Sequence, residues 1–268
     1  SILATRQTTD SMTEWAEYFN KIKNKPDEYK AYIGETEKNL AAAKDSRLRK
    51  HLNWSLAIEQ HELGNLEDIE IQLPNKSFDS RLDIYGTDAL VKILSFGAGH
   101  SESDTLLLLP EDKIAFIGDL GFFETHPYMG SSTPEKWVDI LDDLAASKFR
   151  VFIPGHGPVG TKADLLALKA YILTLQAMAA SVVARGGSED EAAAQTVPDF
   201  AANWAGYGRF EGSMRFFYQR LINEDNIFQS NMNISRALRR EALQAGYVLG
   251  DAENHPISPN QINFPSKE

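Results

Sequence analysis

The stretch FGAGHSESDTLLLLPEDKIAFIGDL, residues 96–120, decides how we interpret the fold. It places His100 in a glycine-rich turn and follows it with two apolar segments, residues 105–109 and 113–117, separated by PED. A proline followed by two acidic residues is typical of a tight turn, so the two segments are predicted to form a hairpin. A hairpin returns the chain to the edge where it started. Asp119 is therefore predicted to lie close to His100.

A second imidazole is predicted at the same edge. Residues 134–147 have a helical pattern with Thr133 as the N-cap, and residues 150–153 form an apolar strand that ends just before His156. A strand–helix–strand crossover makes its two strands parallel, so their carboxyl ends share one edge. Two imidazoles and the carboxylate of Asp119 would meet there. That donor set is typical of zinc and similar divalent metals.

The N-terminal third is predicted to be mainly helical. Residues 1–5 have the pattern of a strand, and the SMTE sequence at residues 11–14 matches a capping box that would open a helix. Helical periodicity continues to Gly64, so residues 10–63 are interpreted as a helical insertion. Three strands are then expected, over residues 69–73, 81–85 and 90–96.

The chain after residue 160 is predicted to be helical again. Apolar residues recur at helical spacing from Lys162 to a stop at Gly186-Gly187, and helices are expected over residues 211–223 and 234–245. We predict three regions: residues 1–160 with the α/β fold, a helical extension over 161–253, and an extended tail over 254–268.

Composition limits the function classes. The chain has 268 residues, a net charge of −11 and no cysteine. Disulfides and thiolate metal sites are excluded, so a metal would need His, Asp or Glu. The acidic balance disfavours nucleic acid as a partner. No continuous apolar run approaches the ~20 residues of a membrane helix, so no membrane partner is expected. We expect a soluble protein, and the cytoplasm and the periplasm both stay open as its compartment.

The motifs at this edge resemble a known family. GAGHSESDT, IAFIGDL and FIPGHGPVG are similar, in this order, to the third, fourth and fifth metal motifs of the metallo-β-lactamase superfamily. The resemblance implies an αββα sandwich with one or two metal ions, usually zinc. It implies that His100 binds the first metal, that Asp119 bridges both metals and the reactive water, and that His156 binds the second metal. In the family the metals activate a water molecule for hydrolysis.

The sequence departs from the family in one respect. The HxHxDH motif, which supplies the other metal ligands, is absent from the chain, and SILATRQTTDSM resembles the segment that follows it. We therefore expect the second half of the fold, with only part of the site. Truncation, a separate chain or a natural remnant would each account for this. The expected partner is the missing N-terminal half of the fold or another copy of the chain, because an isolated half would expose the apolar face of its sheet.

Further residues are candidates for the surroundings of the metal. Asp104 either accepts a hydrogen bond from a ligand histidine or caps its turn. His126 either lines the pocket or lies on a surface loop. Phe122, Phe123 and Tyr128 are candidates for an apolar wall that contacts the substrate.

Two functions from different classes follow. The first is a metal-dependent hydrolase that acts on an ester, lactone, amide or related bond of a small molecule. Asp119 stands where many β-lactamases have cysteine, and no lysine follows it, which favours a general hydrolase. The second is a catalytically incomplete half-domain that serves as a binding or scaffolding subunit.

Overall fold

A computed structural model describes residues 1–86 and 89–223. The described residues divide into two compact units, the first formed by residues 1–77 with 206–208 and the second by residues 78–86, 89–205 and 209–223. The domain limits predicted from the sequence remain predictions. The helix predicted over residues 234–245 and the tail from residue 254 lie outside the described residues.

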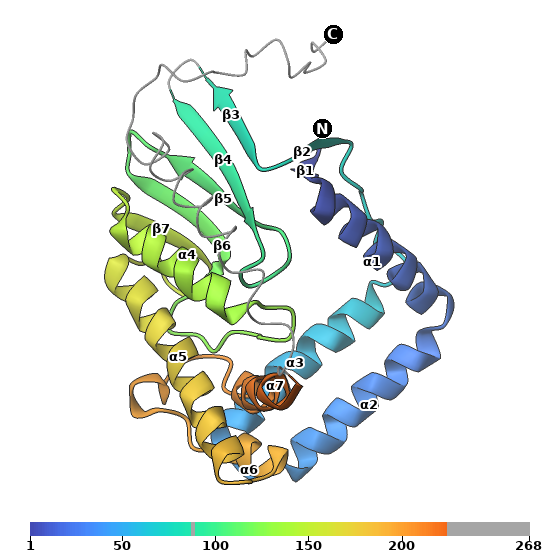
Figure 1. The fold of residues 1–268 in the computed structure, drawn as a ribbon. Coiled ribbons are helices and arrows are strands. Elements are labelled where there is room, and N and C mark those ends of the chain that lie inside the picture. The colour runs from blue at the N-terminus through green and yellow to red at the C-terminus, as the bar shows by residue number, and fades with distance from the viewer. Residues whose placement is uncertain (87–88, 224–268) are drawn as a thin grey trace. The chain divides into compact units, whose positions relative to one another are not determined.

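The second unit is built on a mixed β-sheet (Figure 1). Among the described residues its strands neighbour one another in chain order, and they are antiparallel except for the last pair, which is parallel. The strands are β3 (Arg81–Tyr85), β4 (Leu90–Gly97), β5 (Asp104–Leu109), β6 (Ile114–Phe122) and β7 (Val151–His156). The predicted hairpin and the predicted parallel crossover are both present.

The two faces of this sheet differ in burial. On one face the register aligns Lys92, Leu108, Ala115 and Phe152, all of which are buried. The opposite face carries two apolar rows that are, apart from buried Leu82, only partly covered. One row is Leu82, Ile93, Leu107, Phe116 and Ile153, and the other is Ile84, Val91, Leu109, Ile114 and Val151. Phe116, in the first row, is 41% exposed.

Helices complete the second unit. Figure 1 shows α4 (Pro134–Ala146) across strands β6 and β7, with α5 (Lys162–Ala184) beside it. Thr161 and Asp164 form a capping box at the start of α5, because each side chain accepts a hydrogen bond from the backbone of the other residue. The short helices α6 (Glu189–Ala193) and η1 (Asp199–Ala201) precede α7 (Arg209–Asn223). The predicted α/β class, a mixed sheet flanked by helices, is confirmed.

Helix α5 alone among the described helices is long and apolar enough, by length and composition, to cross a membrane. Core helices can satisfy the same criteria. Its fully buried side chains include the predicted stripe, namely Leu165, Leu168, Ile172, Leu175 and Ala179. The helix packs against α4 and α7. We therefore interpret α5 as the central core helix of the second unit.

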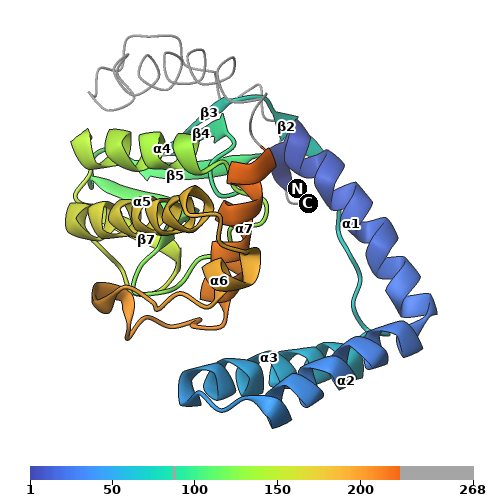
Figure 2. The same cartoon turned by 60° about the horizontal axis from the view of Figure 1, so that its bottom comes forward.

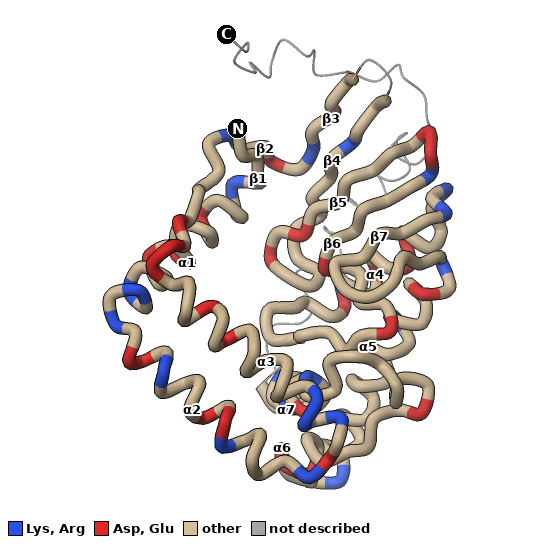
Figure 3. The backbone as a smooth tube through the Cα atoms, turned by 180° about the vertical axis from the view of Figure 1, so that it is seen from behind, with Lys and Arg blue, Asp and Glu red and all other residues tan. Residues whose placement is uncertain are grey.

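The first unit is mainly helical. It contains β1 (Leu3–Thr5), α1 (Arg6–Asn24), α2 (Pro26–Ala42) and α3 (Ser46–Gly64), and β1 pairs with β2 (Lys76–Phe78). Helices α2 and α3 lie side by side (Figure 2). Along α2, Lys30 and Lys38 are interspersed among four acidic residues, Asp27, Glu28, Glu35 and Glu37 (Figure 3).

Two predictions for the first unit are wrong. Helix α1 begins at Arg6, because Thr5 accepts the capping hydrogen bond from Thr8 N, and the predicted capping box from Ser11 lies inside the helix. Residues 69–73 form no strand. Their apolar pattern is real, but the backbone there has no strand partner among the described residues, and pairing with β1 begins only at Lys76.

Gly157 provides a test of the packing between β6 and β7. Its φ is +93°, and an added Cβ would overlap the carbonyl of Phe123. Gly157→Ala should therefore lower the free energy of unfolding by about 2 kcal/mol or more, measured by denaturant titration. Gly212→Ala is the matched control, because nothing lies within 4 Å of its added Cβ inside α7. That control should raise stability by about 0.5–1 kcal/mol. Equal effects of the two substitutions would contradict this packing.

Candidate metal centre

Asp119 lies within β6, not beyond its end as predicted. The register of β6 against β7 shifts on both sides of Gly118, which has a φ of +50°. Gly155 faces the Asp119 carboxylate so closely that a Cβ at residue 155 would overlap Oδ1. The Asp119 side chain is 45% exposed. Because β6 is irregular here and Gly155 has no side chain, the Asp119 carboxylate is accessible to a ligand.

His100 is held in the turn between β4 and β5. The turn closes through Gly99 N, which donates to Ser101 O at 2.9 Å, and Thr133 N donates to Gly99 O at 2.8 Å. The imidazole is buried against Trp137, with ring centroids 5.2 Å apart at 73°. Helix α4 thus fixes this ring from one side.

His156 is the last residue of β7, not just past the strand end as predicted. Its ring stacks on Phe122, with centroids 4.4 Å apart and planes at 18°. Phe123 N donates to His156 O at 2.9 Å. The Phe122 ring also lies 5.1 Å from the His100 ring. One buried phenyl ring therefore contacts both histidines.

The three predicted metal-binding residues come together. His156 Nε2 lies 3.5 Å from Asp119 Oδ1, and His100 Nδ1 lies 3.9 Å from Asp119 Oδ2. The two imidazoles therefore approach different oxygens of one carboxylate. Two ligands that bind one tetrahedral zinc at ~2.1 Å lie about 3.4 Å apart, close to the His156–Asp119 separation.

The fit of a metal to these residues is partial. Within residues 1–86 and 89–223, no group of three or more His, Asp or Glu side chains has the arrangement of a metal site. The donor types are nevertheless those that zinc prefers. The His100 nitrogen that faces Asp119 is Nδ1, whereas Nε2 is buried and has no hydrogen-bond partner among the described residues. A metal beside Asp119 would therefore be bound through Nδ1 and would leave Nε2 without a partner.

Electrostatics keep His100 in the form that can bind a metal. Burial lowers the pKa of His100, and the charges of Asp119 and Asp104 oppose this shift. A lowered pKa favours the neutral imidazole, which has a nitrogen lone pair available for a ligand. The ring is therefore prepared to donate an electron pair near neutral pH.

Asp104 caps the turn that holds His100. Its Oδ1 accepts hydrogen bonds from Ser101 Oγ at 2.6 Å and Ser101 N at 3.1 Å. Burial raises the pKa of Asp104, while the hydrogen bonds from Ser101 oppose the shift. No direct hydrogen bond joins the Asp104 carboxylate to the His100 ring among the contacts of the described residues. Of the two predicted roles, the observed contacts favour the turn cap.

His126 is fully buried, so it does not lie on a surface loop. Its Nδ1 lies 2.6 Å from the hydroxyl of Tyr171 on α5, and its ring packs near Trp204. This pair joins the loop after β6 to the helical layer. We interpret His126 as support for the site, not as a residue that lines it.

The three predicted wall residues differ in exposure. Phe122 and Phe123 are buried, whereas Tyr128 is 58% exposed. Phe123 packs against Gly160, where a Cβ would clash with its ring. By exposure, Tyr128 is the one of these three that a ligand could contact, whereas Phe122 and Phe123 belong to the packing behind the site.

Arg209, which the sequence analysis did not select as a candidate, contacts the loop after β6, because its Nη1 donates to His126 O at 3.4 Å. It is the first residue of α7, and it is half-buried. Burial lowers the pKa of Arg209, and the negative charge of Asp119 opposes this shift. No motif marks Arg209 in the sequence. Its relation to Asp119, 90 residues earlier in the chain, exists only in the folded structure.

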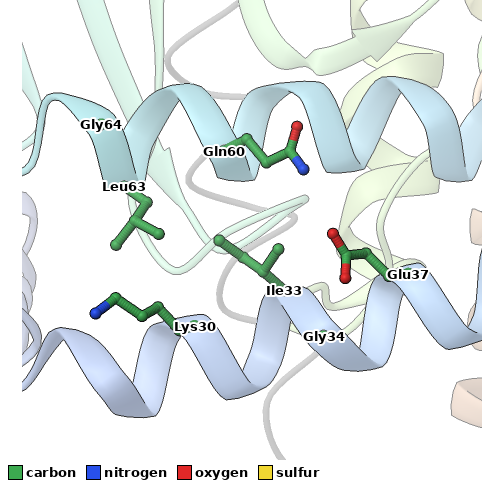
Figure 4. A pocket seen from close by; sticks show the side chains of 7 residues that line it. All are labelled: Lys30, Ile33, Gly34, Glu37, Gln60, Leu63 and Gly64. Atoms are coloured by element: carbon green, nitrogen blue, oxygen red, sulfur yellow. The ribbon is translucent and has the colours of Figure 1, made fainter.

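A separate pocket is formed by residues of the first unit. It has a volume of about 370 Å³ and lies between α2 and α3 in the first unit (Figure 4). The residues that line it are Lys30, Ile33, Gly34, Glu37, Gln60, Leu63 and Gly64. None of the predicted site residues belongs to it, and it is open to solvent. We assign it no catalytic role.

Comparison with solved structures finds metallo-β-lactamase fold proteins. A metallo-β-lactamase from Pontibacter korlensis is 19% identical, with a TM-score of 0.35 over 40% of this chain and 52% of that chain. The inverting sec-alkylsulfatase Pisa1 from Pseudomonas sp. is 17% identical, with a TM-score of 0.43 over 55% of this chain and 26% of that one. The DIM-1 metallo-β-lactamase is 23% identical, with a TM-score of 0.33 over 41% and 54%.

The likeness is limited in extent. The chain spans about half of the two β-lactamases and about a quarter of the sulfatase. No protein-family model and no curated protein sequence matches the chain. The observed sheet and helices are consistent with a partial metallo-β-lactamase fold. At these identities and TM-scores we infer no reaction from the likeness.

The His126–Tyr171 hydrogen bond gives a test of the support behind the site. Tyr171→Phe removes one partner of a buried pair and should lower the free energy of unfolding by about 1–3 kcal/mol, measured by denaturant titration. Tyr32→Phe is the matched control, because Tyr32 is 58% exposed. Its effect should stay within about 0.5 kcal/mol. An equally small loss for Tyr171→Phe would show that the hydrogen bond between His126 and Tyr171 does not stabilise the fold.

Proposed function

We propose that this chain carries part of the active site of a metal-dependent hydrolase of the metallo-β-lactamase type. The observation that supports it most is the approach of His100 and His156 to the two oxygens of Asp119 at one end of the sheet. This arrangement suits a carboxylate that bridges two metal ions, with one imidazole beside each. His100, Asp119 and His156 would hold the metal, most suitably zinc.

Bound zinc would supply an activated water molecule and a positive charge opposite the developing oxyanion. The chain's own residues do the rest. Phe122 fixes both imidazoles by direct ring contact, and Trp137 supports His100 from α4. Asp119 is exposed enough for a small ester, lactone, amide or related substrate to approach. Tyr128 would cover such a substrate with an apolar ring.

The site needs further ligands, which we propose come from the missing half of the fold. Three side chains are too few for two metal ions. The partly covered apolar rows on the second face of the sheet support this proposal, because a face with Phe116 41% exposed suits a second sheet. The partner would be a segment that bears HxHxDH, or another copy of this chain that covers the same face.

A second candidate function is a non-catalytic binding or scaffolding subunit. The absence of a ready three-ligand group among the described residues favours it. In that case the apolar sheet face would be the functional surface, and His100, Asp119 and His156 would form only a hydrogen-bonded cluster.

Zinc binding separates the two candidates. We expect the chain to bind zinc, measured by isothermal titration calorimetry and by elemental analysis after dialysis. Asp119→Asn should weaken binding at least about 10-fold, because even groups that only orient ligands contribute 10- to 100-fold. His61→Gln is the matched control, since it removes an exposed imidazole from α3 in the first unit. Binding that is lost equally in both variants, or absent from the unsubstituted chain, would count against the metal centre.

Reconstitution tests the incomplete site. Addition of an N-terminal segment that bears HxHxDH should produce turnover of 4-nitrophenyl acetate or nitrocefin, and Asp119→Asn should abolish it. The chain alone should show none. Efficient turnover by the chain alone would overturn the proposal that it holds only part of the site. If the chain binds no zinc and shows no turnover even with the added segment, the result would favour the scaffold.

A further inference from the structure

Helix α5 is apolar on two opposite faces, and only one of them is buried. The buried stripe belongs to the core of the second unit, where α5 packs against α4 and α7. Only 33% of an apolar 18-residue stretch of this helix is buried. Leu166 is 48% exposed and Leu173 is 42% exposed. A helix that is apolar all round is normally covered on both sides, so the outward face of α5 suits a partner. This outward stripe consists of Ala163, Leu166, Ala170, Leu173, Ala177 and Ala180, of which the first five are exposed and the last is half-buried.

The outward stripe follows a heptad repeat. An alanine recurs every seven residues, and a second apolar residue follows each alanine after three positions. None of these residues is charged. This spacing is the seam through which two helices of a coiled coil pack side by side. The pattern therefore indicates that the covering element is another helix with a matching seam. The three pairs of the repeat are Ala163 with Leu166, Ala170 with Leu173, and Ala177 with Ala180.

The stripe is complementary to itself when two copies pair in antiparallel orientation. If Ala170 lies opposite Leu173 of a second copy, the same register sets Leu166 opposite Ala177 of that copy. Every leucine then faces an alanine, so large and small side chains alternate along the seam. A parallel pair would instead set leucine against leucine and alanine against alanine. Two identical chains also associate most commonly about a two-fold axis, which an antiparallel pair of helices satisfies.

The residues beside the seam suit the same register. Lys169 would come opposite Gln176 of the second copy, and Ala167 on the other flank would come opposite Thr174. Neither combination brings like charges together. The ammonium group of Lys169 also lies 2.6 Å from Asp142 on α4, so its charge is compensated within one chain. Local electrostatics therefore do not oppose the pairing.

We propose that α5 forms an antiparallel pair with α5 of a second copy of this chain, about a two-fold axis that passes between Ala170 and Leu173. The pair uses neither the metal centre nor the partly covered sheet face, so it does not depend on the proposed function. The helix is about 35 Å long, and a contact through one pair of such helices lies at the lower end of specific interfaces. The dimer should therefore be reversible and depend on concentration.

Sedimentation equilibrium of the full chain tests the pairing. We expect Leu173→Glu to raise the dissociation constant of the dimer at least about 100-fold, because each copy would place an unpaired carboxylate in the apolar seam. Ile222→Glu is the matched control and should leave the constant unchanged, since Ile222 is 49% exposed on α7, outside the stripe. Phe116→Glu on the sheet face should also keep the pair. A dimer that is lost in Phe116→Glu and kept in Leu173→Glu would overturn the proposal, as would a chain that stays monomeric.

Single cysteines test the orientation, because the chain itself has no cysteine. In the antiparallel register the two thiols of Ala170→Cys would be only about 4.5 Å apart along the helix axis, and a short bis-maleimide should link the two copies. Ala163→Cys is the matched control, because the same register separates its two thiols by about 26 Å along the axis. Cross-linking of Ala163→Cys as efficient as that of Ala170→Cys would contradict the antiparallel pair.

A lipid bilayer is the other partner that an apolar helix face can have. Flotation with phosphatidylcholine vesicles distinguishes it from a second copy. We expect the chain to remain in the vesicle-free fraction. A monomeric chain that floats with the vesicles, and that no longer floats after Leu173→Glu, would assign the stripe to a membrane surface and overturn the helix pair.

Discussion

The close approach of β6 and β7 at their carboxyl ends is the constraint on which the rest depends. A side chain at residue 155 would strike Asp119, and one at residue 157 would strike the backbone of Phe123. With glycine at both positions, the strands meet closely enough for the Phe122 ring to stack on His156 and to contact His100. This packing brings both imidazoles to one phenyl ring, and each imidazole lies beside a different oxygen of the Asp119 carboxylate.

The same sheet has two faces with different roles. The face that is covered by helices forms the core and fixes the site from behind through Trp137, whose indole donates to Leu120 O at 3.0 Å. The opposite face is apolar but only partly covered, which gives a physical reason for a partner. The proposed active site would combine the cluster of His100, Asp119 and His156 with a covering layer from a partner.

Much of this arrangement could be predicted from the sequence. Strand periodicity and the turn before Lys113 indicate the hairpin, and the crossover logic brings His156 to Asp119. The missed features depend on tertiary contacts. The bulge at Gly118 extends β6 past Asp119, and no local pattern reveals it. Burial of His126 requires Tyr171, which lies 45 residues later. The contact of Arg209 with the loop after β6 forms between residues 83 positions apart in the sequence.

Anomalous scattering from crystals of this chain soaked in zinc tests the central claim most directly. The account predicts a zinc peak within bonding distance of Asp119 and of at least one of His100 and His156, since these groups already lie 3.5 and 3.9 Å from the carboxylate oxygens. Zinc bound only at other histidines, such as His51 or His61, with no peak at Asp119, would contradict it.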